Sequence, residues 1–104
     1  MKVYTIDVEA REWFDKVNGN SYFSARIVLN YGRKKQKTFL IPLQYGYGTQ
    51  YEWTSVQVLK EKGIIKEEES APLSIICRNK KIILRACKKE NCKKQDVTAW
   101  GKGE

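Results

Sequence analysis

Residues 44–63, QYGYGTQYEWTSVQVLKEKG, decide the fold, because they join a glycine-aromatic loop to the best-marked helix in the chain. Thr49 and Glu52 have the spacing of a capping box, in which each side chain accepts a hydrogen bond from a backbone N–H at the helix start. Gly63 stands where a helix commonly ends in a left-handed residue, as part of a Schellman motif. We therefore predict a helix that begins after Thr49 and ends at Gly63.

Three strands are predicted before this helix. Residues 2–12 alternate between apolar and polar side chains, which is the period of a half-buried strand. An Asn-Gly pair at 18–19 favours a hairpin turn, because both residues tolerate positive φ. Residues 21–31 then form the second strand and residues 37–44 the third, in which Pro42 indicates an edge or a strand end. The predicted inward side chains are Tyr4, Ile6, Val8, Ala10, Phe23, Ala25, Ile27 and Leu29, and the outward ones include Ser24, Arg26 and Asn30.

Two further strands are predicted after the helix. The segments LSIIC at 73–77 and KIILRAC at 81–87 are short β-branched runs joined by three polar residues, so they are interpreted as a second hairpin. The element order β-β-β-α-β-β predicts an α+β fold, with a small antiparallel sheet of about five strands and one helix packed across it.

The length of 104 residues indicates a single domain over 1–104. With 41% hydrophobic and 31% charged residues, the composition is that of a globular protein rather than a disordered one. No apolar run reaches the roughly 18–20 residues that a membrane span requires, so no membrane partner is expected. Residues 88–104 are predicted to form a mobile basic tail unless Val97 and Trp100 anchor it.

The formal net charge of +8 is concentrated in two blocks. Residues 16–51 contain six bases and no acid, and residues 70–104 contain nine bases and three acids. The two other segments, 1–15 and 52–69, are each net negative by two charges. If the two basic blocks fold onto one face, that face suits a polyanion such as a nucleic acid; otherwise they form a soluble, self-repelling surface.

The residue types argue against catalysis. The chain has no histidine, which is the commonest general base at neutral pH, so we predict no enzyme activity and no cofactor. Cys77, Cys87 and Cys92 do not supply the four ligands of a structural zinc site, and no metal is predicted. A disulfide between Cys87 and Cys92 stays open, since abundant Lys, Glu and Ile hint at a thermophilic source while five Asn and five Gln weaken that hint.

The candidate site residues are basic and aromatic. The basic turn at 33–37 and the run that starts at residue 78 are candidate phosphate contacts. The glycine-aromatic loop is a candidate stacking surface, although tyrosines that fill the core and glycines that make a tight turn explain it as well. The predicted nucleic-acid-binding residues are Arg33, Lys34, Lys35, Lys37, Arg78, Lys80 and Lys81 for phosphates, with Tyr45 and Tyr47 for stacking.

Two motifs resemble those of a group of small, uncharacterised proteins encoded by bacteriophages and prophages. The first is WFDKVNGNSYFSARI, an aromatic pair before a turn and a Tyr-x-Ser strand, and the second is QYGYGTQYE, a loop that opens a helix. The similarity covers roughly residues 12–60. Where this chain has Phe23, the group often has histidine, so any role of that histidine is absent here. The resemblance implies viral origin and a role inside the host cell.

The sequence therefore favours a small protein of a phage or an archaeal virus, acting in the host cytoplasm, that binds DNA or RNA without catalysis. The alternative is a protein-interaction module that inhibits or redirects a host factor through its aromatic loop. A third hypothesis is a small pocket for an anionic nucleotide at the helix start.

Overall fold

The computed structural model describes residues 2–101, which form a four-stranded sheet and three helices. The α+β class is confirmed, but the prediction of five strands and one helix is wrong in detail. In chain order the elements are β1 (Thr5–Asp15), β2 (Asn20–Leu29), β3 (Lys37–Tyr45), α1 (Gln50–Glu61), α2 (Leu73–Asn79), β4 (Ile83–Lys89) and α3 (Lys94–Thr98).

The sheet is mixed rather than antiparallel, with the strand order β3-β2-β1-β4. β1 pairs antiparallel with β2 and parallel with β4, and β2 pairs antiparallel with β3. β3 and β4 therefore run in the same direction at opposite edges, and the segment between them is a crossover that includes α1 and α2. β3 is an edge strand, and its pairing with β2 shifts register between Phe23 and Ala25, opposite Pro42, so this irregularity accommodates a residue that has no N–H.

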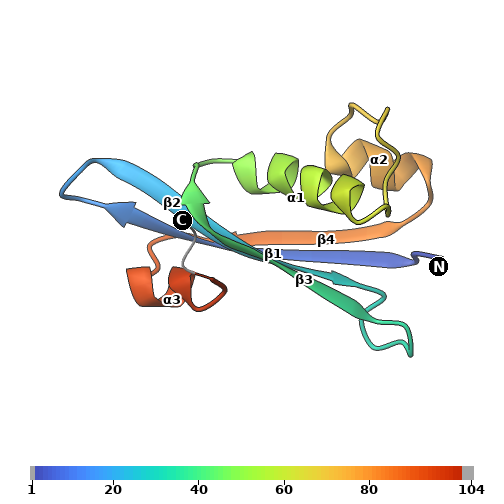
Figure 1. Ribbon diagram of the computed structural model, residues 1–104, viewed down its shortest axis with the longest axis horizontal. Coiled ribbons are helices and arrows are strands. Elements are labelled where there is room, and N and C mark those ends of the chain that lie inside the picture. Colours follow the sequence, from blue (N-terminus) through green and yellow to red (C-terminus); the bar gives the residue numbers. More distant parts are fainter. Residues whose placement is uncertain (1, 102–104) are drawn as a thin grey trace.

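Helices lie on both faces of the sheet. Figure 1 shows α1 and α2 over one face and α3 against the other. The predicted inward residues of the first two strands line the α1 side and are buried, except for Tyr4, which is exposed. Val56 and Leu59 of α1 pack against them. The core therefore lies between α1, α2 and the sheet.

Helix α1 begins where the sequence predicts, but without the capping box. Thr49 occupies the N-cap position, and its side chain makes no capping hydrogen bond. The backbone carbonyl of Thr49 accepts from the N–H of Glu52 instead, at 2.9 Å. At the other end Gly63 is left-handed, with φ +74°, and the Ile64 N–H donates to the Leu59 carbonyl. The predicted Schellman motif is therefore confirmed.

The segment LSIIC forms helix α2, so the predicted second hairpin is wrong. Leu73, Ile76 and Cys77 are all buried, and their spacing of three and four residues places them on one helical face. The carbonyl of Pro72 accepts from the N–H groups of Ile75 and Ile76, which begins the turn. Leu73, Ile76 and Cys77 join the core beside α1, and burial of this helical face overrides the β propensity of the isoleucines.

Two residues that we predicted to face solvent are buried. Ser24 is completely inaccessible and Asn30 is 2% exposed. Ser24 lies on the face that α3 covers, which the pattern of β2 alone does not reveal. Asn30 follows the last residue of β2 in a left-handed conformation, with φ 54°, and its amide serves as a structural link described below.

The C-terminal residues up to 101 belong to the fold. β4 extends to Lys89, and α3 inserts Val97, which has no exposed surface, against the sheet. The Arg11 guanidinium lies 4.0 Å from the centre of the Trp100 ring. The Leu43 N–H of the β3 edge donates to the Gly101 carbonyl at 2.9 Å. Residues 102–104 of the predicted basic tail lie outside the described part of the chain.

Candidate nucleic-acid interface and aromatic groove

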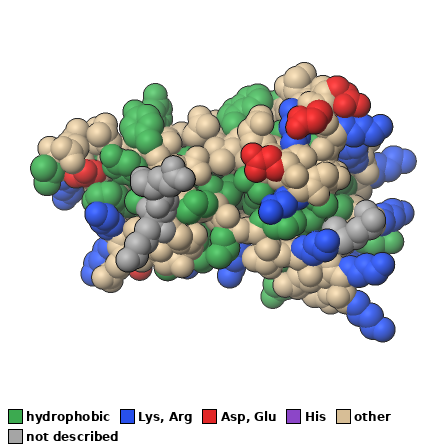
Figure 2. Space-filling view, in the orientation of Figure 1, with side chains coloured by type: hydrophobic (Ala, Val, Ile, Leu, Met, Phe, Trp, Pro, Cys, Tyr) green, Lys and Arg blue, Asp and Glu red, His purple; other side chains and the backbone are tan. Residues whose placement is uncertain are grey.

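The two predicted groups of phosphate contacts lie at the same end of the sheet. The connection between β2 and β3 contains Arg33, Lys34 and Lys35, and the connection between α2 and β4 contains Lys80 and Lys81. The start of β1 lies between these two connections. We call this region the basic end, and Figure 2 shows Lys and Arg side chains gathered along the corresponding rim, at the right of the view.

Backbone hydrogen bonds fix both connections to β1. The Asn30 N–H donates to the Thr5 carbonyl at 3.0 Å, and the Ile83 N–H donates to the Tyr4 carbonyl at 3.0 Å. Segments some 50 residues apart in the chain therefore meet on either side of Tyr4. Sequence patterning could not reveal this meeting, because it depends on the parallel pairing of β1 with β4.

The Asn30 side chain links the N-terminus to the end of β2. Its Oδ1 accepts from the Tyr4 N–H at 2.7 Å, and its Nδ2 donates to the Lys2 carbonyl at 2.9 Å. Both bonds are partly buried, where an unpaired backbone group is costly. This link positions Lys2 and Tyr4 beside the turn that follows.

Tyr4 organises the cations of the basic end. The Arg33 guanidinium lies 4.1 Å from the centre of the Tyr4 ring, and the Lys2 ammonium lies 5.1 Å from it. Such cation–π contacts restrict flexible cations without neutralising them. A pocket of about 270 Å³ opens here. The described residues that line it are Tyr4, Asn30 and four cations, Lys2, Arg33, Lys34 and Lys35, with no acid among them.

The remaining predicted phosphate contacts are not among the residues that line this pocket. Lys37 begins β3 and is exposed, as are Arg78 and Lys81. Lys80 is weaker as a phosphate contact because its ammonium lies 4.0 Å from the Glu69 carboxylate. Sequence reasoning missed Lys2 and also Lys62, whose ammonium lies 5.6 Å from the Phe39 ring near the start of β3.

The two stacking candidates do not join the basic end. Lys37 and Tyr45 are the first and last of the nine residues of β3, so they lie at opposite ends of this strand. At a rise of about 3.3 Å per residue the separation is roughly 26 Å. Tyr45 and Tyr47 are exposed, at 60% and 68%. The predicted site is thus two separate surfaces.

At this second end, aromatic rings form a row across three strands. Trp13 and Tyr22 stack with ring centres 5.5 Å apart, Tyr22 meets Tyr45 edge-on at 6.0 Å, and Tyr45 meets Tyr47 edge-on at 6.5 Å. The row follows from register, since Trp13 pairs with Tyr22 and Tyr22 with Tyr45. The predicted hairpin turn at 18–19 is consistent with the first pairing, but the sequence analysis assigned no register to either pairing.

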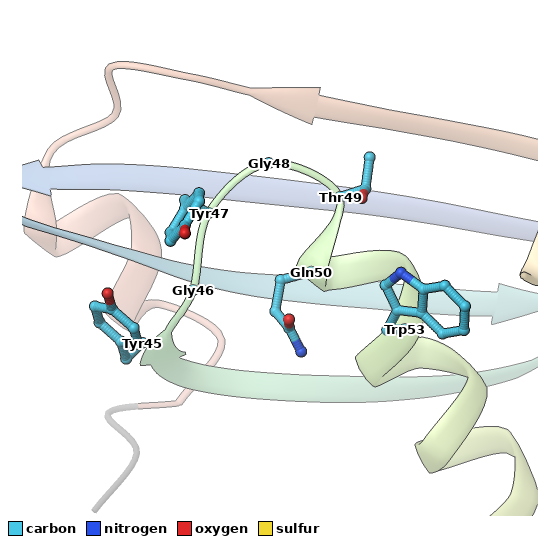
Figure 3. Close-up of a pocket in the computed structure, with 7 residues that line it drawn as sticks. All are labelled: Tyr45, Gly46, Tyr47, Gly48, Thr49, Gln50 and Trp53. Carbon is cyan, nitrogen blue, oxygen red and sulfur yellow. The ribbon is translucent and has the colours of Figure 1, made fainter.

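Next to this row lies an open groove at the start of α1. Its volume is about 560 Å³, and it is lined by Tyr45, Gly46, Tyr47, Gly48, Thr49, Gln50 and Trp53. We call it the aromatic groove. Figure 3 shows Gln50 between the two tyrosines on one side and Trp53 on the other. A Cβ atom at Gly46 would lie 2.6 Å from the Phe23 ring, so only glycine allows the loop to pass so close to the core.

The aromatic groove does not favour the hypothesis of an anionic nucleotide. Among the described residues, none that lines it is charged. The N–H groups of Gln50 and Glu52 already donate to backbone carbonyls of the loop, and the Glu52 carboxylate adds negative charge to the first turn. An anion here would have only the remaining helix N–H groups to compensate it.

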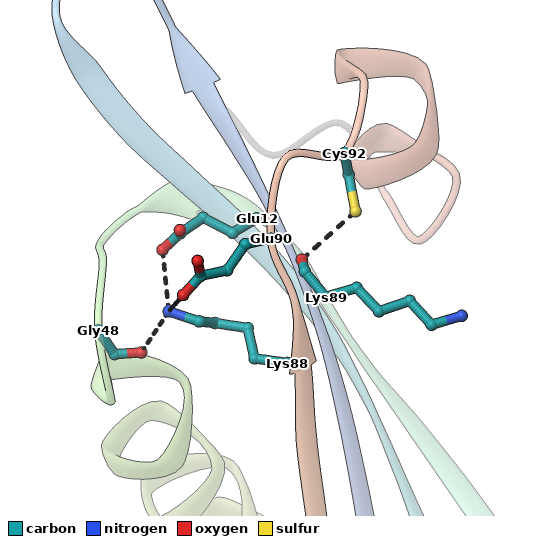
Figure 4. Close-up of polar contacts among 6 residues, drawn as sticks. All are labelled: Glu12, Gly48, Lys88, Lys89, Glu90 and Cys92. Atoms are coloured by element: carbon teal, nitrogen blue, oxygen red, sulfur yellow. Dashed lines mark hydrogen bonds and ion pairs between the residues drawn. The ribbon is translucent and has the colours of Figure 1, made fainter.

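Lys88 holds the loop beside the groove. Its ammonium donates to the Gly48 carbonyl at 3.0 Å and to Glu12 at 3.2 Å, and it lies 3.5 Å from Glu90 (Figure 4). Because its side chain is only 14% exposed and has two carboxylate partners, Lys88 is not available to a phosphate. Its role is to fix the position of Gly48 relative to β4.

The cysteines are all free thiols, including Cys87 and Cys92. The Cys92 thiol donates to the Lys89 carbonyl at 3.3 Å (Figure 4). Burial raises the pKa of the Cys77 thiol to about 11. Within residues 2–101, no group of three or more His, Cys, Asp or Glu side chains is placed to hold a metal ion.

No protein-family model matches the chain, and neither a curated protein nor a solved structure shows significant similarity to it. The resemblance to phage-encoded proteins therefore stays a prediction. None of the helices in the described part of the chain has the length and apolar character that crossing a bilayer requires.

Proposed function

We propose that this protein binds nucleic acid, without catalysis, through the basic end. The observation that supports the proposal most is the meeting of two basic connections, distant in the chain, around the start of β1. We further propose that it is a small viral protein that acts in the host cytoplasm, as the phage-like motifs imply.

The chemistry of the basic end suits phosphates better than bases. Within residues 2–101, four cations and no acid line one pocket, and Arg33 is restrained by Tyr4. Contacts of this kind position a nucleic-acid backbone and do not read its sequence. The proposal therefore specifies binding that depends strongly on salt and weakly on base sequence.

Charge reversal with a matched control tests the proposal. Lys34→Glu with Lys35→Glu changes the basic end, whereas Lys93→Glu with Lys94→Glu makes the same change of net charge near α3. Fluorescence anisotropy with labelled DNA and RNA of about 30 nucleotides, single- and double-stranded, measures Kd. We expect the first pair to weaken binding at least tenfold more than the second, because each lost phosphate contact also loses its counterion release. Equal effects of the two pairs would point to nonspecific net charge and refute the basic end as the site.

A second candidate function is a protein-interaction module that inhibits or redirects a host factor. Its support is the exposure of Tyr45 and Tyr47, at 60% and 68%, beside an uncharged groove. Aromatic residues of this kind dominate binding energy at protein interfaces. Tyr47→Ala should weaken binding to such a factor and leave the denaturant midpoint nearly unchanged, whereas a loss of about 3 kcal/mol in stability would mark Tyr47 as a core residue.

A further inference from the structure

We propose that the aromatic groove binds a proline-rich peptide segment in the polyproline II conformation. This inference names the ligand class for the second candidate function and rests on it. It is independent of nucleic-acid binding at the basic end, which lies at the opposite end of β3.

The first argument is the distribution of exposed ring surface. Tyr45, Tyr47 and Trp53 are 60%, 68% and 45% exposed, although each is large and mostly apolar. They lie around one groove of about 560 Å³, which is within the usual size of ligand pockets. Proline-rich segments dock in grooves lined by aromatic side chains, where the proline rings pack against the ring faces.

The second argument is charge. The seven lining residues in the described part of the chain include no acid and no base, so none of them can neutralise a phosphate backbone or a charged peptide. An uncharged ligand does not need such a partner. This contrast with the basic end, where four cations line a smaller pocket, is why we assign the groove to a peptide and not to unpaired bases.

The third argument is hydrogen bonding. The lining side chains carry several donors: the two tyrosine hydroxyls, the Trp53 indole N–H and the Gln50 amide, whose Nε2 also donates to the Thr54 hydroxyl at 3.4 Å. A polyproline II segment makes no internal hydrogen bonds and keeps its carbonyl groups free to accept, and its prolines have no N–H to satisfy. Donors at the tips of apolar rings therefore complement the ligand's surplus of acceptors.

The fourth argument is that the groove is held in place before binding. The Gly46 N–H donates to the Ser21 carbonyl at 3.1 Å, and the Gly48 carbonyl accepts from Lys88 at 3.0 Å. The Gln50 N–H donates to the Tyr47 carbonyl at 3.1 Å. A fixed groove and a stiff ligand both reduce the ordering cost of association.

Nuclear magnetic resonance titration of the labelled protein tests the inference. The probe is a capped oligoproline of about ten residues, and the control ligand is a glycine-serine peptide of the same length. We expect saturable shifts at the amides of Gly46 and Gly48 and at the Trp53 indole N–H with oligoproline alone. Tyr47→Ala should weaken binding at least tenfold. Tyr31→Ala is the matched control, because Tyr31 is similarly exposed, at 66%, and outside the groove, and it should leave the Kd unchanged.

Three results would overturn the inference. The first is the absence of resonance shifts at the groove residues up to about 1 mM peptide. A Kd of about 1 mM corresponds to a binding free energy of only about −4 kcal/mol, so even weak binding would be detected. The second is equal binding of the glycine-serine peptide. The third is an oligothymidine that shifts the same resonances and displaces oligoproline, which would assign the groove to unpaired bases. Lys34→Glu with Lys35→Glu should leave the peptide Kd unchanged, so failure here is distinct from failure of the nucleic-acid proposal.

Discussion

Asn30 offers the sharpest test of how the basic end is built. We expect Asn30→Ala to destabilise the protein by about 3 kcal/mol, which is large for a polar residue at a strand end. The residue is 2% exposed and left-handed, and its amide bonds to the backbone of both Lys2 and Tyr4.

Two physical contributions make up this magnitude. The two hydrogen bonds each contribute about 1 kcal/mol, and their loss leaves the partly buried Tyr4 N–H without its partner. Alanine at φ 54° adds about 1 kcal/mol of backbone strain, which asparagine tolerates better. Asn30→Gly removes the same hydrogen bonds without the strain, so it should cost about 2 kcal/mol.

Urea or guanidinium unfolding of the parent and both variants, followed by tryptophan fluorescence, measures these differences. Hydrogen exchange of the Tyr4 amide gives a local check, because this N–H should lose protection in both variants. A cost below about 1 kcal/mol for Asn30→Ala, or a greater cost for glycine than for alanine, would refute the proposed link.

Three further predictions concern stability. Thr49→Ala should cost less than about 0.5 kcal/mol of stability because no side-chain cap is present. Gly63→Val should cost at least about 1–2 kcal/mol because φ is +74° at this position. If chemical unfolding shows a larger cost for Thr49→Ala than for Gly63→Val, Thr49 does cap the helix and this part of the account is wrong. Val97→Ala should cost about 2 kcal/mol if α3 stays packed on the sheet, and an unchanged midpoint would mean a mobile tail. The Cys77 pKa of about 11 keeps the folded thiol protonated while the unfolded thiol ionises near 9, so stability should fall as pH rises from 9 towards 11. Cys77→Ala should lessen this fall in stability. If the parent and the variant show the same dependence of stability on pH, the raised pKa of the Cys77 thiol is contradicted.

The sequence predicted the parts of the fold that depend on local pattern. Alternation in the first two strands identified Ile6, Val8 and Ala10 as core, and all three are buried. Gly63 and its neighbours identified the end of α1, because a Schellman motif needs only a few adjacent residues. Pro42 indicated an edge strand, which β3 is.

Features that depend on distant partners could not be predicted. LSIIC has β-branched residues, and only its burial in the core beside α1 shows why the segment forms a helix. Ser24 is buried because α3 returns to cover it. Thr49 makes no side-chain cap: its backbone, at φ −95° and ψ 11°, lacks the extended conformation usual at an N-cap, and its own carbonyl accepts from the Glu52 N–H.

The candidate site was predicted in its residue types but not in its arrangement. Arg33 to Lys37 and Arg78 to Lys81 were identified from charge alone, and the fold brings them to one end. Tyr45 and Tyr47 were grouped with them as nucleic-acid-binding residues, but they lie at the opposite end of β3 from Lys37. Lys2 was missed because its place beside Tyr4 and Arg33 depends on the Asn30 link.

The salt dependence of nucleic-acid affinity tests the central proposal most directly. Anisotropy with a DNA or RNA of about 30 nucleotides, repeated at several salt concentrations, gives log K against log salt. If the basic end neutralises about four to six phosphates, the slope should be roughly −3 to −5. The four substitutions Lys34→Glu, Lys35→Glu, Arg78→Glu and Lys81→Glu together should nearly abolish binding. No detectable binding to any of these nucleic acids at about 50 mM salt and tens of micromolar protein would contradict the account.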